Sequence, residues 1–119
     1  MRMYNFTMPW APSINGYRAV ARNRIITTAR GRDYKARAIN AIALQGLAGE
    51  QVEGNISLSI KLNPPTLRRY DVDNYCKAIL DAITESGFWL DDEQVSRLKV
   101  VKGEKVAGGR VDVSVECIN

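Results

Sequence analysis

Alternating apolar and polar residues mark three β-strands along the chain. The clearest run covers residues 56–62, where every second side chain is Ile or Leu, and a proline pair ends it. Residues 4–8 and 110–118 show the same two-residue period. This period places one face of each strand in the core and the other in solvent. We expect residues 95–101 to form a fourth strand.

Two helices are predicted between these strands. Residues 33–47 are rich in alanine and place apolar side chains at helical spacing, with Gly46 or Gly49 positioned to end the helix. Residues 73–86 carry apolar side chains at i, i+3, i+4 and i+7. Gly87 follows where a helix often ends in a left-handed residue.

The order of the predicted elements is roughly β-α-β-α-β-β, which indicates an α+β fold. We expect one domain over residues 1–119, with a mixed β-sheet and two helices packed on one face of it. The length suits one hydrophobic core rather than two. Residues 17–32 are expected to form a loop or arm, in which residues 25–27 are apolar enough for one more short strand.

The charge is distributed unevenly along a chain of ordinary composition. Hydrophobic residues make up 45% and charged residues 25%, and the net charge is +4. Residues 1–49 contain eight Lys or Arg against one Asp, whereas residues 50–119 contain nine against twelve acidic residues. This asymmetry suggests that the first half contacts phosphate and that the second half holds the acidic chemistry.

Several classes of protein are disfavoured by what the chain contains. Cys76 and Cys117 are too few for a disulfide framework or a zinc site. No apolar run approaches the length of a membrane helix, and the first residues do not form a secretory signal. We therefore expect a soluble cytoplasmic protein that does not bind a membrane.

The stretch from residue 68 to residue 95 gathers side chains that suit a hard cation. They are Asp71, Asp73, Asn74, Lys77, Asp91 and Asp92. The chain has no histidine, and carboxylate oxygens are the donors that Mg²⁺ prefers, so we expect Mg²⁺ as the cofactor with Mn²⁺ as a substitute. A strand-to-helix junction and a helix-to-strand loop can lie side by side across a sheet. We therefore expect Asp92 to approach Asp71 and Asp73.

Ordinary structural roles are also open for these residues. Asp71 or Asp73 would suit the N-cap of the second helix, and Asp73 with Lys77 would form an i,i+4 ion pair worth about 0.2–0.5 kcal/mol. Lys77 would then only neutralise acid, whereas in an active site it would stabilise charge on a transferring phosphate. The second acidic cluster at residues 91–93 favours the functional interpretation. A glycosidase-type carboxylate pair fits poorly, because a basic chain of this size offers little sugar-binding surface.

Basic residues are concentrated in the predicted arm and directly before the first aspartate. The expected DNA contacts are Asn15, Tyr17, Arg18, Arg22, Arg24, Arg30, Arg32, Arg68 and Arg69. A merely solvated face would normally mix both signs of charge, but residues 17–32 contain no acid. Contact with the phosphate backbone is favoured over reading of bases.

Three blocks of the chain resemble the RusA family of Holliday-junction resolvases. Residues 8–17 are similar to its P-x-x-P-S-x-N-x-x-Y opening, and residues 69–77 to its R-x-D-x-D-N-x-x-K core. Residues 87–95 are similar to its G-x-x-x-D-D-x-Q-V element. Two positions depart from the pattern: Ala11 replaces a common proline, and Tyr70 stands where a basic residue is frequent. These departures bear on DNA affinity or sequence preference more than on activity.

The resemblance implies a Mg²⁺-dependent homodimeric endonuclease that makes paired nicks in four-way DNA junctions. The family's catalytic and metal-binding carboxylates fall on Asp71, Asp73 and Asp92, and its catalytic lysine falls on Lys77. The supporting residues would be Asp91, Asn74 and Gln94. A two-fold dimer also suits the approximate two-fold symmetry of a stacked junction. Two alternatives stay open, namely a less selective metal-dependent nuclease acting on flaps or RNA, and a non-catalytic DNA-binding module.

Overall fold

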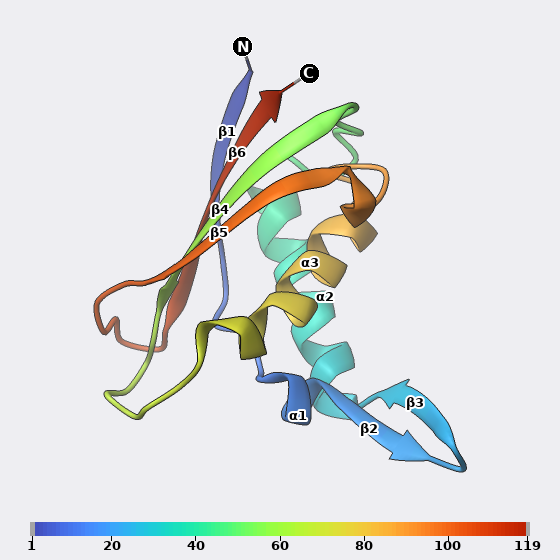
Figure 1. Ribbon diagram of the computed structural model, residues 1–119, viewed down its shortest axis with the longest axis vertical. Coiled ribbons are helices and arrows are strands. Elements are labelled where there is room, and N and C mark those ends of the chain that lie inside the picture. The colour runs from blue at the N-terminus through green and yellow to red at the C-terminus, as the bar shows by residue number, and fades with distance from the viewer. Residues whose placement is uncertain (1, 119) are drawn as a thin grey trace.

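A four-stranded mixed sheet forms one layer of the structure, a computed structural model that describes residues 2–118 (Figure 1). Its strands are β1 (Met3–Met8), β4 (Asn55–Asn63), β5 (Val95–Lys102) and β6 (Arg110–Ile118). They lie in the order β1-β6-β4-β5, and the β4–β5 pair is parallel while the other two pairs are antiparallel. The four predicted strands are confirmed, with bounds within one or two residues.

The second layer consists of two helices on one face of the sheet (Figure 1). They are α2 (Ala29–Leu44) and α3 (Cys76–Glu85). Two 3-10 turns flank α3, namely η1 (Val72–Tyr75) before it and η2 (Asp92–Gln94) after it. A further short helix, α1 (Ile14–Tyr17), follows the proline-rich stretch after β1.

The core fills the space between the helices and the sheet. Every second residue of β4 from Ile56 to Leu62 is buried, as the alternation predicted. Against this strand α3 packs its small and branched apolar face, and α2 contributes Tyr34 and Ile42. The predicted layer of both helices on one face is therefore confirmed.

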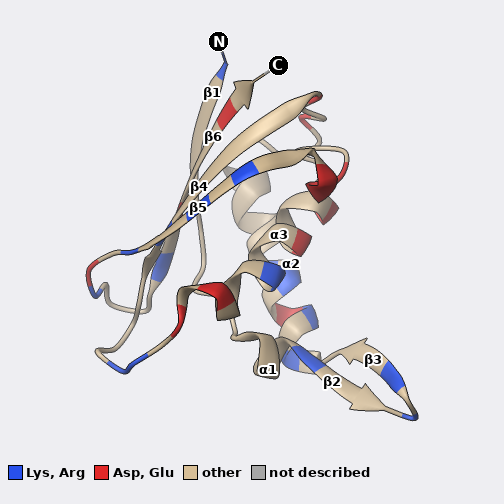
Figure 2. Ribbon diagram, in the orientation of Figure 1, with Lys and Arg blue, Asp and Glu red and all other residues tan. Residues whose placement is uncertain are grey.

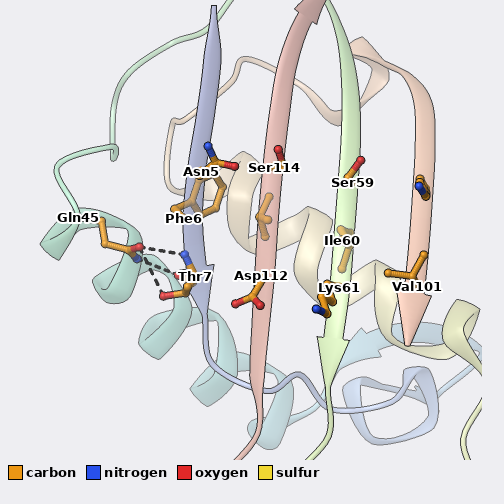
Figure 3. A pocket seen from close by; sticks show the side chains of 12 residues that line it. Asn5, Phe6, Thr7, Gln45, Ser59, Ile60, Lys61, Val101, Asp112 and Ser114 are labelled. Carbon is orange, nitrogen blue, oxygen red and sulfur yellow. Dashed lines mark hydrogen bonds between the residues drawn. The ribbon is translucent and has the colours of Figure 1, made fainter. Parts of the chain in front are cut away.

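The opposite face of the sheet is polar and slightly hollow. A cavity of about 520 Å³ lies there, lined by side chains such as Asn5, Ser59 and Ser114 (Figure 3). At its margin Gln45 reaches the edge strand, where its amide accepts from the backbone N–H of Thr7 at 2.9 Å and donates to the carbonyl of Thr7 at 2.8 Å. The aspartates of the two predicted clusters do not line this hollow.

A β-hairpin occupies the segment that we predicted as a loop or arm, and its second strand confirms the short strand expected at residues 25–27. Strands β2 (Arg18–Ala21) and β3 (Arg24–Thr27) pair antiparallel and project from the body of the domain (Figure 1). Arg22 and Asn23 form the turn, with φ of 51° and 61°. Both residues therefore adopt the left-handed conformation of a two-residue type I′ turn. The element order is thus longer than the predicted β-α-β-α-β-β, because α1 and the hairpin precede the first long helix.

The predicted helix bounds need two corrections. Helix α2 begins at Ala29 rather than at residue 33, because the Thr28 hydroxyl accepts from the backbone N–H of Gly31 and caps the helix there. It ends at Leu44, close to Gly46, whose φ is +78°. The second helix opens with η1 rather than with regular α-helix, and Gly87 follows its end with φ of +77°, as predicted.

Candidate active site

Asp71 and Asp73 lie at the turn that leads into α3. Asp71 occupies the N-cap position of η1, yet its side chain makes no capping hydrogen bond, and Asp73 lies within the turn. Both side chains are exposed, and neither forms an ion pair with the residues described. The capping role that the sequence left open is therefore absent here. The turn presents two unengaged carboxylates to solvent.

An aromatic cluster holds this turn against the domain. Trp10, Tyr70 and Tyr75 pack with ring centroids 4.9–5.8 Å apart. The ammonium of Lys102, at the end of β5, lies 4.7 Å from the centre of the Tyr70 ring. Burial raises the pKa of Tyr70, whose hydroxyl has no hydrogen-bond partner among the residues described. Because Tyr70 and Tyr75 flank the two aspartates, this packing holds the turn that carries them.

Lys77 pairs with an aspartate that we did not predict as a site residue. Its ammonium lies 2.8 Å from Asp81 Oδ1, one helical turn further along α3. The Tyr17 hydroxyl donates to Asp81 Oδ2 at 2.7 Å. Tyr17 is only 1% exposed, so its predicted direct contact with DNA would require it to leave this partner. The pair that the sequence suggested between Asp73 and Lys77 is replaced by Lys77–Asp81, because Asp73 lies in the 3-10 turn and not on the α-helix.

Asp92 sits in a separate turn that its neighbours hold in place. Asp91 Oδ1 accepts from the backbone N–H of Glu93 at 3.3 Å, while Gln94 Oε1 accepts from the backbone of Leu90 and Asp91. This reciprocal arrangement is a capping box. The amide nitrogen of Gln94 also donates to two carbonyls of the loop before β4. Asp91 and Gln94 thus fix η2, which is the geometry that their predicted supporting role requires.

The surroundings of Asp92 disfavour its charge. Burial raises the pKa of Asp92, and a hydrogen bond with Asp91 and the nearby charge of Asp81 raise it further. Lys77 acts in the opposite direction. Asp92 therefore belongs to a group with Lys77 and Asp81, in which the carboxylates of Asp81 and Asp92 share the Lys77 ammonium.

The two acidic groups lie apart in a single chain. Figure 2 shows the acidic residues of η1 near the start of α3 and those of η2 near its other end. Within residues 2–118, no three Asp, Glu, Cys or His side chains are placed to hold one metal ion. The expected approach of Asp92 to Asp71 and Asp73 is therefore not present within one chain. The three aspartates do not meet in one chain because α3 lies between the η1 turn and the η2 turn.

The predicted basic residues divide into two exposed regions. Arg22 and Arg24 lie at the tip of the hairpin, and Arg68 and Arg69 lie in the loop between β4 and η1 (Figure 2). Arg32 donates to the carbonyl of Thr27 at 2.8 Å and so braces the hairpin. The remaining members of the predicted set are Asn15, Arg18 and Arg30, on α1, at the start of β2 and on the first turn of α2. Asn74 lies in η1 beside Asp73.

Two features of the site escaped the sequence prediction. Asp81 follows Lys77 by four residues, a spacing that could have identified the ion pair. The contact between Trp10 and the turn at Tyr75 joins segments far apart in sequence, and no local pattern signals it.

Exposed carboxylates beside arginines and a lysine, on a small basic α+β domain, define a class of protein that acts on a polyanionic backbone. Comparison with known proteins identifies the family. A family model described as Endodeoxyribonuclease RusA matches residues 9–116. The chain therefore belongs to the RusA family of endodeoxyribonucleases.

Individual relatives are similar along almost their whole length. The chain is 40% identical over 119 residues to the Crossover junction endodeoxyribonuclease RusA of Escherichia coli strain K12 and to the protein of that name from Enterobacteria phage 82. The Shigella sonnei protein of the same name is 40% identical over 115 residues. In each case 97% of this chain and 95% of the relative are covered. Among residues 2–118, no helix is long and apolar enough to cross a membrane.

Proposed function

We propose that this chain is a Mg²⁺-dependent endonuclease of the cytoplasm that resolves four-way DNA junctions by paired symmetric nicks. The observation that carries the proposal is the state of Asp71 and Asp73. Both are exposed, neither caps the turn that holds them, and an aromatic cluster fixes that turn. Carboxylates placed in this way are available to a cation and to the phosphate that it neutralises.

The chemistry of the donors suits Mg²⁺, which takes oxygen ligands and often only a few from protein. Asp71, Asp73 and Asp92 would hold the ion. When bound, Mg²⁺ would activate a water for in-line attack on the phosphodiester. Lys77 would leave its ion pair with Asp81 and stabilise the negative charge that develops on the phosphate. Arg68 and Arg69 would contact neighbouring phosphates.

The separation of the two acidic groups supports a homodimer as the functional unit. A two-fold dimer repeats each turn once, so Asp92 of one copy can complete the site that Asp71 and Asp73 begin in the other. Lys102, at one end of β5, packs on Tyr70, and η2 precedes the other end. If two chains associate antiparallel along β5, the η2 turn of each copy lies toward the η1 turn of its partner. Two sites related in this way would serve two symmetric strands.

Incubation with labelled DNA tests the activity directly. Four-way junction, flap, duplex, single strand and RNA would each be incubated with Mg²⁺, with Mn²⁺ and with EDTA. We expect paired nicks in the junction with either metal and no product with EDTA. Equal cleavage of flaps or RNA would instead indicate a less selective nuclease. Binding to the junction without any metal-dependent product would indicate a DNA-binding module.

Mixing two inactive variants tests whether the site is shared between copies. Asp73→Asn and Asp92→Asn would be co-expressed with different tags, and the mixed dimer would be purified through both. If the site combines residues from two copies, one site of the mixed dimer keeps all its carboxylates, and nicking of one strand returns. If each chain holds a complete site, both sites are damaged and no activity returns. Each homodimer provides the inactive control.

A further inference from the structure

The β2–β3 hairpin exposes apolar side chains at the end of a projecting element. Val20 is 75% exposed, and its cross-strand partner Ile25 is 69% exposed. Ile26, on the other face of the ribbon, is 43% exposed. A two-stranded ribbon without a covering layer is marginal in water, and exposed apolar side chains at its tip gain nothing from solvent. The hairpin is therefore built for contact with something outside this chain.

The base of the hairpin is anchored while its tip is free. The backbone N–H of Thr28 donates to the carbonyl of Tyr17 at 2.9 Å, and the Thr28 hydroxyl donates to the carbonyl of Gly16 at 2.6 Å. Tyr17 is in turn held by Asp81, the partner of Lys77. The base of the hairpin is thus held at Tyr17, which is two contacts away from Lys77.

The positive charge of the hairpin favours nucleic acid as its partner. Arg18, Arg22 and Arg24 lie on the ribbon, and residues 14–32 contain no acidic side chain. If the hairpin met the same hairpin of a second copy, these arginines would face each other without any carboxylate to offset them. A nucleic-acid backbone supplies the complementary charge, and a two-stranded ribbon has the dimensions of a groove.

We propose that the Val20–Ile25 pair is an apolar wedge that enters a DNA branch point between base pairs, while the flanking arginines hold the backbone on either side. The proposal rests on the proposed function and names the part of the protein that selects branched DNA. Apolar side chains that enter DNA must unstack a base step, which is costly in a continuous duplex. At a branch point the stack is already interrupted on one side. The same wedge therefore favours a junction over a duplex, whereas arginines alone would bind both.

Removing the apolar groups without changing charge or strand preference tests the wedge. The double variant Val20→Thr with Ile25→Thr keeps β-branched side chains and every arginine. Leu44→Gln, which changes an exposed apolar residue at the opposite end of α2, is the matched control. Affinity for junction and duplex would be measured in EDTA at several salt concentrations, with 2-aminopurine placed next to the crossover to report unstacking.

We expect the double variant to lose about 10-fold in junction affinity relative to duplex, a difference that a few buried methyl groups can supply. The 2-aminopurine signal of the bound junction should fall, and the salt dependence should stay unchanged because no phosphate contact is lost. Leu44→Gln should behave as the unmodified chain.

An unchanged junction preference and an unchanged 2-aminopurine signal would overturn the wedge, and Mg²⁺-dependent junction nicking would then still support the proposed function. Altered sedimentation of the double variant without DNA would also overturn it, because the hairpin would then be a contact between copies. If the unmodified chain neither binds nor cuts junctions, the proposed function itself fails.

Discussion

Aspartates at the two 3-10 turns differ in how much of their bonding capacity the fold already uses. Asp91 caps η2, and together with Gln94 it closes a capping box. Asp71 stands at the equivalent position of η1 without any capping hydrogen bond. A carboxylate that the fold does not need is one whose replacement should affect chemistry rather than stability. The two turns therefore give residue-scale predictions of opposite kinds.

Asp73→Asn should abolish cleavage and leave junction binding equal or tighter. The change removes a proposed metal ligand and one negative charge near phosphate, while it keeps the shape of the side chain. Thermal stability should change little, because the Asp73 side chain is exposed and forms no ion pair among the residues described. A nicking assay with a gel-shift titration measures both effects. Metal-dependent cleavage near the unmodified rate would remove Asp73 from the site.

Asp92→Asn should raise the thermal midpoint at neutral pH in the absence of metal. Because the pKa of Asp92 is raised, chiefly by burial, the native state binds its proton more tightly than the unfolded chain, whose reference pKa is 3.8. The contribution of this carboxyl to stability thus falls as pH rises from about that value through the folded pKa. At pH 7 the ionised form is a cost that asparagine removes, so a rise in the thermal midpoint is expected.

The gain should shrink as the pH is lowered through the folded pKa of Asp92, below which the native carboxyl is protonated. Melting curves in EDTA at several pH values test this. Asp91→Ala is the contrasting control, because it loses a cap and should lower stability by about 1 kcal/mol. A lower midpoint for Asp92→Asn at pH 7 would show that the charged form is favourable in the fold.

At the scale of elements, α2 and the hairpin meet at Gly31. A Cβ built there would lie 2.7 Å from the Tyr17 carbonyl oxygen and 2.9 Å from Thr27 Cγ2. Alanine normally stabilises a helix relative to glycine by about 1 kcal/mol, but here it would push the hairpin base away from the helix. Gly31→Ala should therefore destabilise the protein, by about 1–3 kcal/mol in denaturant unfolding. Gly46→Ala, with open space around its Cβ but φ of +78°, separates backbone strain from this steric effect.

The elements that the sequence predicted well are those in which the pattern of buried and exposed side chains repeats along the element. β4 and β6 keep a strict alternation because one face is always buried, and α3 shows its apolar stripe for the same reason. The hairpin lacked such a signal, since most of its side chains are exposed and its turn is Arg22-Asn23 rather than a glycine pair. Helix α2 began earlier than predicted because a single hydroxyl, that of Thr28, sets its start.

At the scale of the whole molecule, the candidate site was predicted in its parts but not in its assembly. The motifs placed Asp71, Asp73 and Lys77 close together because they are neighbours in sequence. The position of Asp92 depends instead on how the η2 turn packs against the far end of α3 and the loop before β4. No local pattern encodes that packing. The separation of the two acidic groups within one chain therefore emerges only from the fold.

Lys77→Ala should lower the single-turnover cleavage rate by about 10² while junction affinity changes little, an amount typical of losing one preorganised electrostatic group. Dimers that combine one unmodified chain with one Lys77→Ala chain should then nick one strand quickly and the opposite strand slowly. Strand-specific labels on the junction measure the two rates separately. Equal rates on both strands, or sedimentation as a monomer on junction DNA, would contradict paired sites.

The Gln45 side chain limits how copies of this chain can aggregate through the edge of the sheet. It occupies both backbone hydrogen-bonding groups of Thr7 on the free side of β1, and the ion pair between Arg2 and Glu50, 3.7 Å apart, lies at the start of the same strand. An uncovered edge would let one sheet recruit another without limit, which is the geometry of fibres. Gln45 hinders growth at the β1 edge, and β5 is the other edge of the four-stranded sheet, where association of two copies through β5 would end at two copies. Gln45→Ala should thus increase the light scattered by the protein as concentration and time increase.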